Sequence, residues 1–218
     1  LLGRRREPLE ELRLTVPGEI VLADVSRPDE VERARQQAGA VDILVNNAGI
    51  AHSAPVKSLR LVDWERLMAT NGGGLMVMGQ AFLTSMAERG WGRIVNIASV
   101  AARAGGRYLA AYAASKHAVL GFTRSLAEEV AAQGITVNAV CPGFVDTPMT
   151  EQTLANIMAK TGMSREDAEK SLTRFNPQGR LIEAEEVAYW VGCLCLPRGR
   201  GVNGKALILA GGGLLRCI

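Results

Sequence analysis

The stretch Val41-Asp-Ile-Leu-Val-Asn-Asn-Ala-Gly49 is an apolar run that ends in a polar turn closed by a glycine. A short apolar run bounded by such a turn is typical of a buried strand. Residues 19–23, 93–98, 136–141 and 206–209 have the same character, and segments of helical periodicity separate these runs. Strands joined through helices pair in parallel with right-handed crossovers. The sequence therefore predicts an α/β fold, a doubly wound parallel sheet covered by helices on both faces.

The predicted helices lie at residues 29–38, 63–89, 108–132 and 185–196. Asn71 and the three glycines after it interrupt the second helix. Each glycine costs about 1 kcal/mol in helix propensity, which favours a kink at this point. A polar, helix-rich insert covers residues 147–178. No internal repeat, low-complexity tract or linker divides the chain, so we expect residues 1–218 to form a single domain.

The composition excludes several classes of protein. Lys and Arg number 25 against 22 Asp and Glu, and a net charge of +3 is too small to indicate a nucleic-acid partner. Hydrophobic residues at 48% and charged residues at 22% argue against disorder. No apolar run approaches the about 20 residues of a membrane span, and the basic start leads into no apolar signal segment. We therefore expect a cytoplasmic protein with neither a nucleic-acid nor a membrane partner.

The cysteines and histidines indicate no metal site. Cys193 and Cys195 lie two apart in a predicted helix, where such a pair faces different directions. No second Cys or His pair lies at metal-ligand spacing, so we expect reduced thiols at all four cysteines, which are Cys141, Cys193, Cys195 and Cys217.

Polar residues follow the predicted strands, at the carboxyl ends where doubly wound sheets bind their ligands. Asn46 and Gly49 follow one of these strands. An asparagine amide can tie neighbouring strands together, and a glycine lets the backbone pass close to a ligand. Taken alone, this turn fits a structural role equally well.

Ser99 ends the next strand, and Tyr112 and Lys116 stand four residues apart on the following helix. Residues at this spacing share one helix face. A nearby ammonium favours the phenolate and lowers a tyrosine pKa, so Tyr112 is expected to act as an acid in carbonyl reduction and as a base in alcohol oxidation. Ser99 is expected to hydrogen-bond the same substrate oxygen. Most Tyr and Lys pairs at this spacing are solvated helix faces, and only the combination with Ser99 and the Asn46 turn makes the pattern specific.

With these motifs the sequence resembles the short-chain dehydrogenase/reductase family over nearly its whole length. The positions that carry the resemblance are residues 46–49, Asn71, Ser99, Tyr112, Lys116, Pro142, Gly143 and Thr147. The resemblance implies a Rossmann-type fold of three layers. It also implies that Tyr112 donates and accepts the proton, that Ser99 orients the substrate carbonyl, and that Lys116 binds the nicotinamide ribose and tunes Tyr112. Asn71 would hold a water in a proton relay to Lys116.

The resemblance also implies a nicotinamide cofactor. In the family, an arginine after the second strand commonly meets the 2′-phosphate of NADP, and Arg4 and Arg5 occupy that place. An acidic residue there would instead bond the free 2′-hydroxyl of NAD. Because arginine is well matched to phosphate, NADP is favoured over NAD, although arginines near a chain end can also be merely solvated. The predicted cofactor-binding residues are Arg4, Arg5, Asp24, Val25, Asn46, Ala48, Gly49, Tyr112, Lys116, Pro142, Gly143, Val145 and Thr147.

The insert at residues 147–178 is expected to be the substrate lid, because it follows the strand predicted to contact the nicotinamide. Its apolar stripe hints at an acyl substrate, although such stripes more often pack internally; it consists of Met149, Leu154, Ile157 and Met158. Residues 176–181 and the helix after them resemble 3-oxoacyl reductases, 3-hydroxyacyl-CoA dehydrogenases and polyketide-type ketoreductases. We therefore predict an oxidoreductase that uses NADP to reduce a 3-oxoacyl thioester. The alternatives are an NAD-dependent dehydrogenase of 3-hydroxybutyrate, a sugar or a steroid, and a structural or regulatory homologue that binds no cofactor.

One family feature is missing before Asn46, namely a glycine-rich turn of the form G-x-x-x-G-x-G. Leu1 and Leu2 resemble the tail of the second family strand, so the first βα unit is expected to be absent from these 218 residues. A segment missing from the sequence as given, a misassigned gene start and a real truncation each explain this, and the intact catalytic residues favour the first two. The helices at residues 75–89 and 108–132 correspond to a dimer interface in the family, which implies a homo-oligomer, a dimer or a tetramer.

Overall fold

The computed structural model describes residues 1–213, and Cys217 lies outside them. The strands and main helices follow the chain in this order: β1 (Leu2–Gly3), α1 (Arg6–Thr15), β2 (Val21–Leu22), α2 (Pro28–Ala38), β3 (Ile43–Asn46), α3 (Leu61–Met68), α4 (Gly74–Glu88), β4 (Gly92–Ile97), α5 (Ala110–Val130), β5 (Ile135–Pro142), α6 (Pro148–Thr161), α7 (Arg165–Thr173), α8 (Ala184–Cys195) and β6 (Ala206–Leu209). The predicted alternation of strands and helices is confirmed. Within the described residues, no helix combines the length and the apolar character that a membrane crossing needs.

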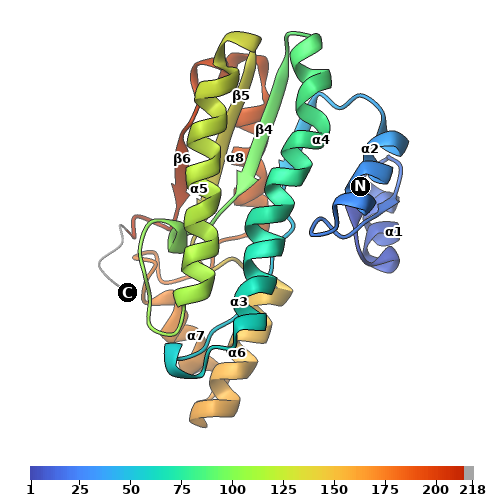
Figure 1. Ribbon diagram of the computed structural model, residues 1–218. Coiled ribbons are helices and arrows are strands. Elements are labelled where there is room, and N and C mark those ends of the chain that lie inside the picture. The colour runs from blue at the N-terminus through green and yellow to red at the C-terminus, as the bar shows by residue number, and fades with distance from the viewer. Residues whose placement is uncertain (214–218) are drawn as a thin grey trace.

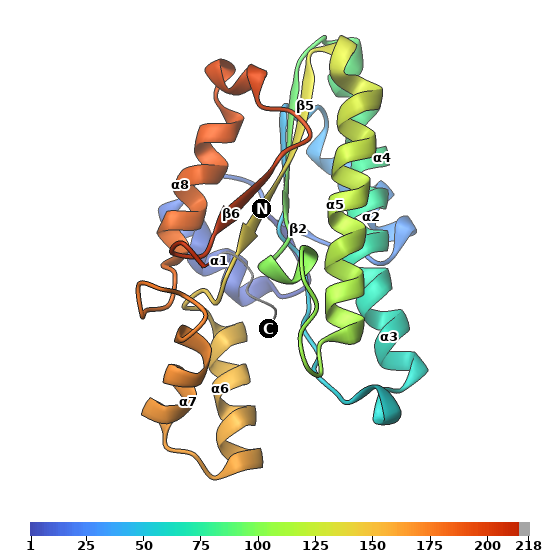
Figure 2. The same ribbon diagram turned by 90° about the vertical axis from the view of Figure 1, so that its left-hand side faces the viewer.

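All strand pairs are parallel, as predicted, and the strands form two sheets. The larger sheet has the order β3-β4-β5-β6, and the smaller one pairs β1 with β2. Figures 1 and 2 show α4 and α5 along one face of the larger sheet and α8 on the other. This arrangement confirms the Rossmann-like α/β fold with three layers.

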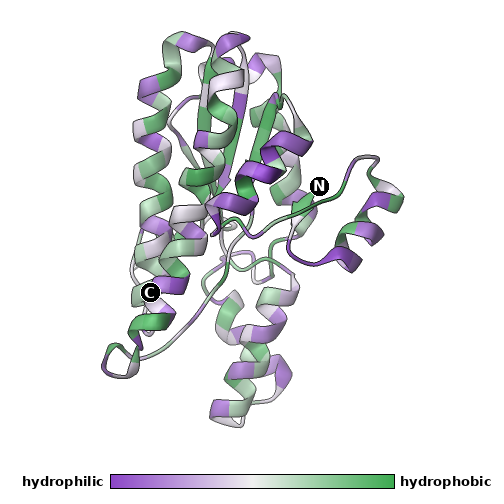
Figure 3. Cartoon of the chain, turned by 45° about the vertical axis from the view of Figure 1, so that its right-hand side comes forward, coloured by the Kyte–Doolittle hydropathy of each residue, from purple (hydrophilic) through white to green (hydrophobic). Residues whose placement is uncertain are grey.

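The core lies on both faces of the larger sheet, because β4 and β5 are buried along their length. Ile94 and Val137 pack against the α4 and α5 side chains, which include Met78 and Leu126. On the other face, Val95 and Val140 pack against Leu194 of α8. Strands buried on both faces are continuously apolar rather than alternating, which is why these runs stand out in the sequence. Figure 3 shows the same division, with hydrophobic strands inside and hydrophilic residues on the outer helices.

The glycine run after Asn71 does not end the helix. Residues Ala69–Gly73 form a π-helical turn that joins α3 to α4, and the Gly74 amide donates to the Ala69 carbonyl five residues earlier. Gly74 is also needed for packing, since a Cβ there would lie 2.6 Å from Cγ2 of Val25. The irregular turn buries Asn71, which is only 3% exposed. The predicted helix irregularity is therefore present as a π-turn, a feature often found at functional sites.

The insert forms two helices, α6 and α7, which lie beyond the ends of the strands in Figure 2. Leu154 and the α7 residues Ala168 and Leu172 make a small core of their own, against which Ile157 and Met158 pack. Met149 is 44% exposed and is therefore the one residue of the predicted apolar stripe with a largely open side chain. Most of the stripe thus holds the two helices together.

The three cysteines in the described residues form no disulfide. Cys141 is buried, whereas Cys193 and Cys195 are partly buried. Residues 1–213 contain no group of His, Cys, Asp and Glu side chains with the arrangement of a metal site.

Candidate active site

The predicted turn after β3 is tied to the neighbouring strand. Asn46 and Asn96 are partners in the β3–β4 register, and Nδ2 of Asn46 donates to Oδ1 of Asn96 over 2.9 Å. Nδ2 of Asn96 in turn donates to Oγ1 of Thr123 on α5, also over 2.9 Å. This chain of amides fixes two strand ends and α5 relative to one another.

Ser99, Tyr112 and Lys116 are brought together where β4 ends and α5 begins. Oγ of Ser99 accepts the N–H of Ala101 over 3.1 Å, and the Ser99 side chain is near enough to Tyr112 to lower the pKa of its hydroxyl. Nζ of Lys116 lies 6.0 Å from the centre of the Tyr112 ring and donates to the carbonyl of Ile97, the last residue of β4, over 2.9 Å. The strand end thereby sets the positions of the serine and the lysine around the tyrosine.

Gly49 packs directly against two of the predicted catalytic residues. A Cβ at this position would lie 3.3 Å from Oδ1 of Asn71 and 3.5 Å from Nζ of Lys116. A Cβ here would crowd the Asn71 amide and would touch the Lys116 ammonium, so the glycine serves close approach rather than an unusual backbone angle. The turn after β3 therefore belongs to the same site as Asn71 and Lys116.

The Asn71 amide clamps two segments together. Its Oδ1 accepts the backbone N–H of Ile50, and its Nδ2 donates to the Ile50 carbonyl and to Oγ of Ser115, with distances between 2.9 and 3.0 Å. The side chain thus joins the loop after β3 to α5. That Asn71 also holds a relay water stays a prediction.

Ser115 is a site residue that the sequence reasoning missed. It is fully buried, and its Oγ accepts from Asn71 and donates to the backbone carbonyl of Tyr112 over 2.8 Å. The sequence could have indicated Ser115 through its position between Tyr112 and Lys116. A hydroxyl on the buried face of a helix needs hydrogen-bond partners. Ser115 links the π-turn to the turn of α5 that carries Tyr112.

Burial changes the acidity of Tyr112 and Lys116. Loss of water around Tyr112 raises the pKa of its hydroxyl, and the hydrogen bond from Ser99 only partly opposes this effect. Loss of water likewise lowers the pKa of Lys116 to about 8, against the opposing influence of Cys141. The expectation that the ammonium lowers the tyrosine pKa is therefore wrong for this structure. Desolvation penalises the charged form of both groups, and the Lys116 ammonium bonds to the Ile97 carbonyl.

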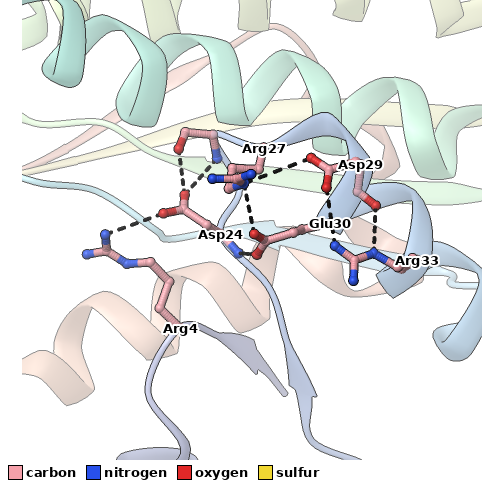
Figure 4. Close-up of polar contacts among 7 residues, drawn as sticks. Arg4, Asp24, Arg27, Asp29, Glu30 and Arg33 are labelled. Carbon is pink, nitrogen blue, oxygen red and sulfur yellow. Dashed lines mark hydrogen bonds and ion pairs between the residues drawn. The ribbon is translucent and has the colours of Figure 1, made fainter.

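The predicted adenosine side of the site lies at the ends of β1 and β2 (Figure 4). Nη1 of Arg4 lies 3.5 Å from Oδ2 of Asp24, and Arg4 keeps 63% of its side chain exposed. Oδ1 of Asp24 accepts from both the backbone and the hydroxyl of Ser26, which lowers the carboxyl pKa. The Asp24 backbone N–H donates to Glu30 over 2.8 Å, and Glu30 also pairs with Arg27. Ser26 and Glu30 thus fix Asp24. The sequence could have indicated both residues, because Ser26 follows a predicted strand and Glu30 lies in the first turn of the next predicted helix.

The remaining predicted cofactor residues lie in two places. Val25, Asn46 and Ala48 line a small cavity of about 20 Å³ next to Asn71, which is large enough for one water molecule. Thr147 lies beside an open hollow of about 690 Å³ at the start of α6. Val145 bridges to Ile182, and Gly143 donates its N–H to Leu209 at the end of β6 over 2.8 Å. Pro142 is buried as the last residue of β5.

The residues present fit a dinucleotide with a 2′-phosphate. Arg4 and Arg5 place exposed guanidinium groups after β1, and guanidinium binds phosphate well. At the other end of the site, Gly49 lies close to Lys116. The groups available to a ligand there are the backbone of the turn and the lysine ammonium, rather than bulky side chains. Both ends lie at the carboxyl side of parallel strands, where such folds bind nucleotides.

The comparisons with known proteins agree with this geometry. The family model for short chain dehydrogenases matches residues 2–157. A 3-oxoacyl-[acyl-carrier-protein] reductase of Vibrio cholerae is 35% identical over 199 residues, which are 89% of this chain and 77% of the relative. A D-beta-hydroxybutyrate dehydrogenase of Cupriavidus necator is 33% identical over 195 residues, 87% of this chain and 76% of the relative.

A solved structure of an actinorhodin polyketide ketoreductase with NADPH superposes with a TM-score of 0.91. It is 38% identical to this chain, and the match covers 97% of this chain and 85% of the solved one. Sequence and fold thus agree over nearly all of the chain, which belongs to the short chain dehydrogenases, a family of oxidoreductases.

Proposed function

We propose that the chain is an NADP-dependent ketoreductase that converts the ketone of a 3-oxoacyl thioester into a secondary alcohol. The observation that carries this proposal is the buried Lys116, whose Nζ lies 6.0 Å from the centre of the Tyr112 ring and bonds to the end of the strand that Ser99 follows. The reductases among the relatives and the NADPH in the similar structure support the substrate class and the cofactor.

In this mechanism, the hydroxyls of Ser99 and Tyr112 both hydrogen-bond the substrate carbonyl oxygen. Bound NADPH supplies the hydride for the carbonyl carbon. Tyr112 then gives the proton of its hydroxyl to the oxygen of the forming alkoxide. The raised pKa of Tyr112 keeps that proton in place at neutral pH, which suits reduction. Lys116, with a pKa of about 8, is able to exchange a proton near neutral pH and so to help restore the protonated tyrosine.

The proposal assigns the cofactor contacts to the residues predicted from the sequence. Arg4 and Arg5 would hold the 2′-phosphate, Asp24 and Val25 the adenine, and Lys116 the nicotinamide ribose. The turn after β3 would line the path between these ends, and the segment from Pro142 to Thr147 would lie against the carboxamide. We further propose a single domain, with α6 and α7 as the substrate lid, that works in the cytoplasm.

Replacing Tyr112 by phenylalanine tests the mechanism, because it removes the acidic hydroxyl and keeps the ring. NADPH consumption with acetoacetyl-CoA is expected to fall by about 10²–10⁴-fold, the usual contribution of a general acid. Titration with NADPH should still show binding, since the contacts of Arg4 and Lys116 are kept. An unchanged rate in this variant would contradict the proposed role of Tyr112.

The second candidate is an NAD-dependent dehydrogenase of a secondary alcohol, and the similarity to a D-beta-hydroxybutyrate dehydrogenase favours it. Steady-state rates of acetoacetyl-CoA reduction with NADPH, compared with oxidation of 3-hydroxybutyrate, a sugar alcohol and a steroid with NAD, separate the two. Faster turnover of the alcohols with NAD would replace the first proposal. A chain that binds neither NADPH nor NADH would act as a structural or regulatory homologue instead.

A further inference from the structure

Tyr108 has an unusual backbone conformation for an exposed aromatic residue. Its φ is 67°, and in the described residues every other positive φ belongs to a glycine. The left-handed region is strained for a residue with a Cβ, most of all for a bulky one. Burial of the ring does not offset this strain, because Tyr108 is 52% exposed. Strain of this kind persists where the surrounding structure imposes it, and it concentrates at ligand sites.

The surroundings of Tyr108 connect it to the active site. Its carbonyl accepts the N–H of Ala54 over 2.9 Å, so it ties the loop after β3 to the chain that enters α5. That same loop is clamped by Asn71 at Ile50. Tyr108 lies four residues before Tyr112, just ahead of the first turn of α5. The strained residue therefore sits between two segments that carry the catalytic groups.

The exposed surface around Tyr108 is both aromatic and cationic. The guanidinium of Arg107 lies 5.5 Å from the centre of the Tyr108 ring. No carboxylate of residues 1–213 lies within ion-pair distance of Arg107, which is exposed. An unpaired guanidinium next to an open ring suits a ligand that is apolar or amide-like along its length and ends in a phosphate.

We propose that Tyr108 and Arg107 recognise the carrier arm of a thioester substrate, the phosphate-terminated pantetheine chain. The Tyr108 ring packs against the arm, and the Arg107 guanidinium binds its phosphate. This inference rests on the proposed reduction of a thioester, and it names the two residues that distinguish such a substrate from a small ketone. Because the arm is shared by coenzyme A and by acyl carrier protein, the experiments below compare both sources.

Replacing Tyr108 by glycine removes the ring and also the strain, since glycine adopts a positive φ readily. The melting temperature is expected to stay level or rise, so that a loss of function is not a loss of folding. The ratio of kcat/KM for acetoacetyl-CoA to that for ethyl acetoacetate is expected to fall about five- to tenfold, as for the loss of one aromatic contact. Tyr108→Phe should restore the ratio. Tyr189→Ala is the matched control, because it removes an aromatic residue that is 66% exposed on α8, on the far face of the sheet.

Replacing Arg107 by glutamine tests the phosphate contact. The KM is expected to rise for acetoacetyl-CoA and for acetoacetyl-acyl-carrier-protein alike, and to change less than twofold for acetoacetyl-pantetheine, which has no phosphate. A rise confined to the CoA thioester would overturn the assignment to the shared phosphate. Equal effects of Tyr108→Gly on acetoacetyl-CoA and ethyl acetoacetate would overturn the role of the ring. A chain that reduces no ketone at all would overturn the proposed function itself. A chain that reduces ethyl acetoacetate, with variants that change neither the kcat/KM ratio nor the KM for the thioesters, would overturn only the role of Tyr108 and Arg107.

Discussion

At the scale of single residues, the candidate site depends on buried polar groups that satisfy one another. Asn71, Ser115 and the Tyr112 carbonyl form a continuous chain of hydrogen bonds between the π-turn and α5. A buried group that loses its partner costs more free energy than the hydrogen bond itself contributes. This series of hydrogen bonds therefore holds the segment of the candidate residue Tyr112 in one position, and Ser115 is its central member.

Replacing Ser115 by alanine is expected to lower the free energy of unfolding by about 1–3 kcal/mol, because Asn71 loses one acceptor and the Tyr112 carbonyl loses one donor. The kcat for ketone reduction should fall while the KM for NADPH changes little. Urea unfolding and steady-state kinetics measure the two effects. Ser85→Ala is the matched control, since Ser85 bonds only the Phe82 carbonyl of its own helix. Equal losses of kcat in both variants would argue against a positioning role for Ser115.

The lowered pKa of Lys116 predicts how stability depends on pH. Its pKa is about 8 in the folded chain and about 10.5 in the unfolded one, so the unfolded chain binds more protons between these values. The contribution of Lys116 to the free energy of unfolding therefore rises as the pH increases from 8 to 10.5, because the folded chain has lost its buried charge and the unfolded chain still binds the proton. The free energy of unfolding of the unaltered chain should rise relative to Lys116→Met over this range. A difference between the two proteins that does not vary with pH would contradict the lowered pKa.

At the scale of elements, the glycines after Asn71 serve packing as well as helix geometry. Gly74 is the first residue of α4 and lies against Val25, which follows β2. The missing Cβ lets the start of α4 approach the segment that follows β2, and the π-turn before α4 buries Asn71. The start of α4 and the position of the candidate catalytic residue Asn71 are thus set by the same four residues.

Replacing Gly74 by alanine should therefore destabilise the chain, because the new Cβ would overlap Val25 and α4 would have to move. Overpacking of this kind costs about 1–3 kcal/mol. Gly192→Ala in α8 is the matched control, since a Cβ there meets no atom within 4 Å and gains about 1 kcal/mol of helix propensity. Thermal or urea unfolding of the two variants should move in opposite directions. Stabilisation by both would show that α4 has more room than the structure indicates.

At the scale of the whole molecule, the helices divide into a face with α4 and α5 and a face with α8 (Figures 1 and 2). We propose that the first face forms a homo-oligomer interface, as the resemblance to the family implied. Met76 on α4 is 43% exposed, an apolar side chain that such an interface would cover.

Size-exclusion chromatography with light scattering is expected to give a dimer or a tetramer of the 23.3 kDa chain. Met76→Glu should shift the mass toward the monomer, because a charge would have to be buried without a partner. Glu166→Lys on α7 is a control on a different surface, with a side chain that is 78% exposed. A monomer at all concentrations would contradict the interface.

Much of the fold could be predicted because its signals are local. The apolar runs of β3, β4 and β5, the turn at Gly49 and the spacing of Tyr112 and Lys116 all lie within short stretches of sequence, and periodicity shows which residues share a face. The ends of the elements differ from the prediction. The helix predicted from residue 108 starts at Ala110, because the positive φ of Tyr108 leaves no mark in the sequence.

By itself, then, the sequence determined the α/β class, the alternation of helices with parallel strands, and the candidate residues of the site. Only the tertiary structure decided that Ser115 joins Asn71 to Tyr112, that Gly49 packs on Lys116 and that Glu30 anchors Asp24. It also decided the sign of the Tyr112 pKa shift, which the spacing to Lys116 alone had predicted wrongly. The physical reason is the same in each case. Burial and contacts between segments far apart in the chain set hydrogen-bond partners and desolvation, and no local pattern of residues encodes them.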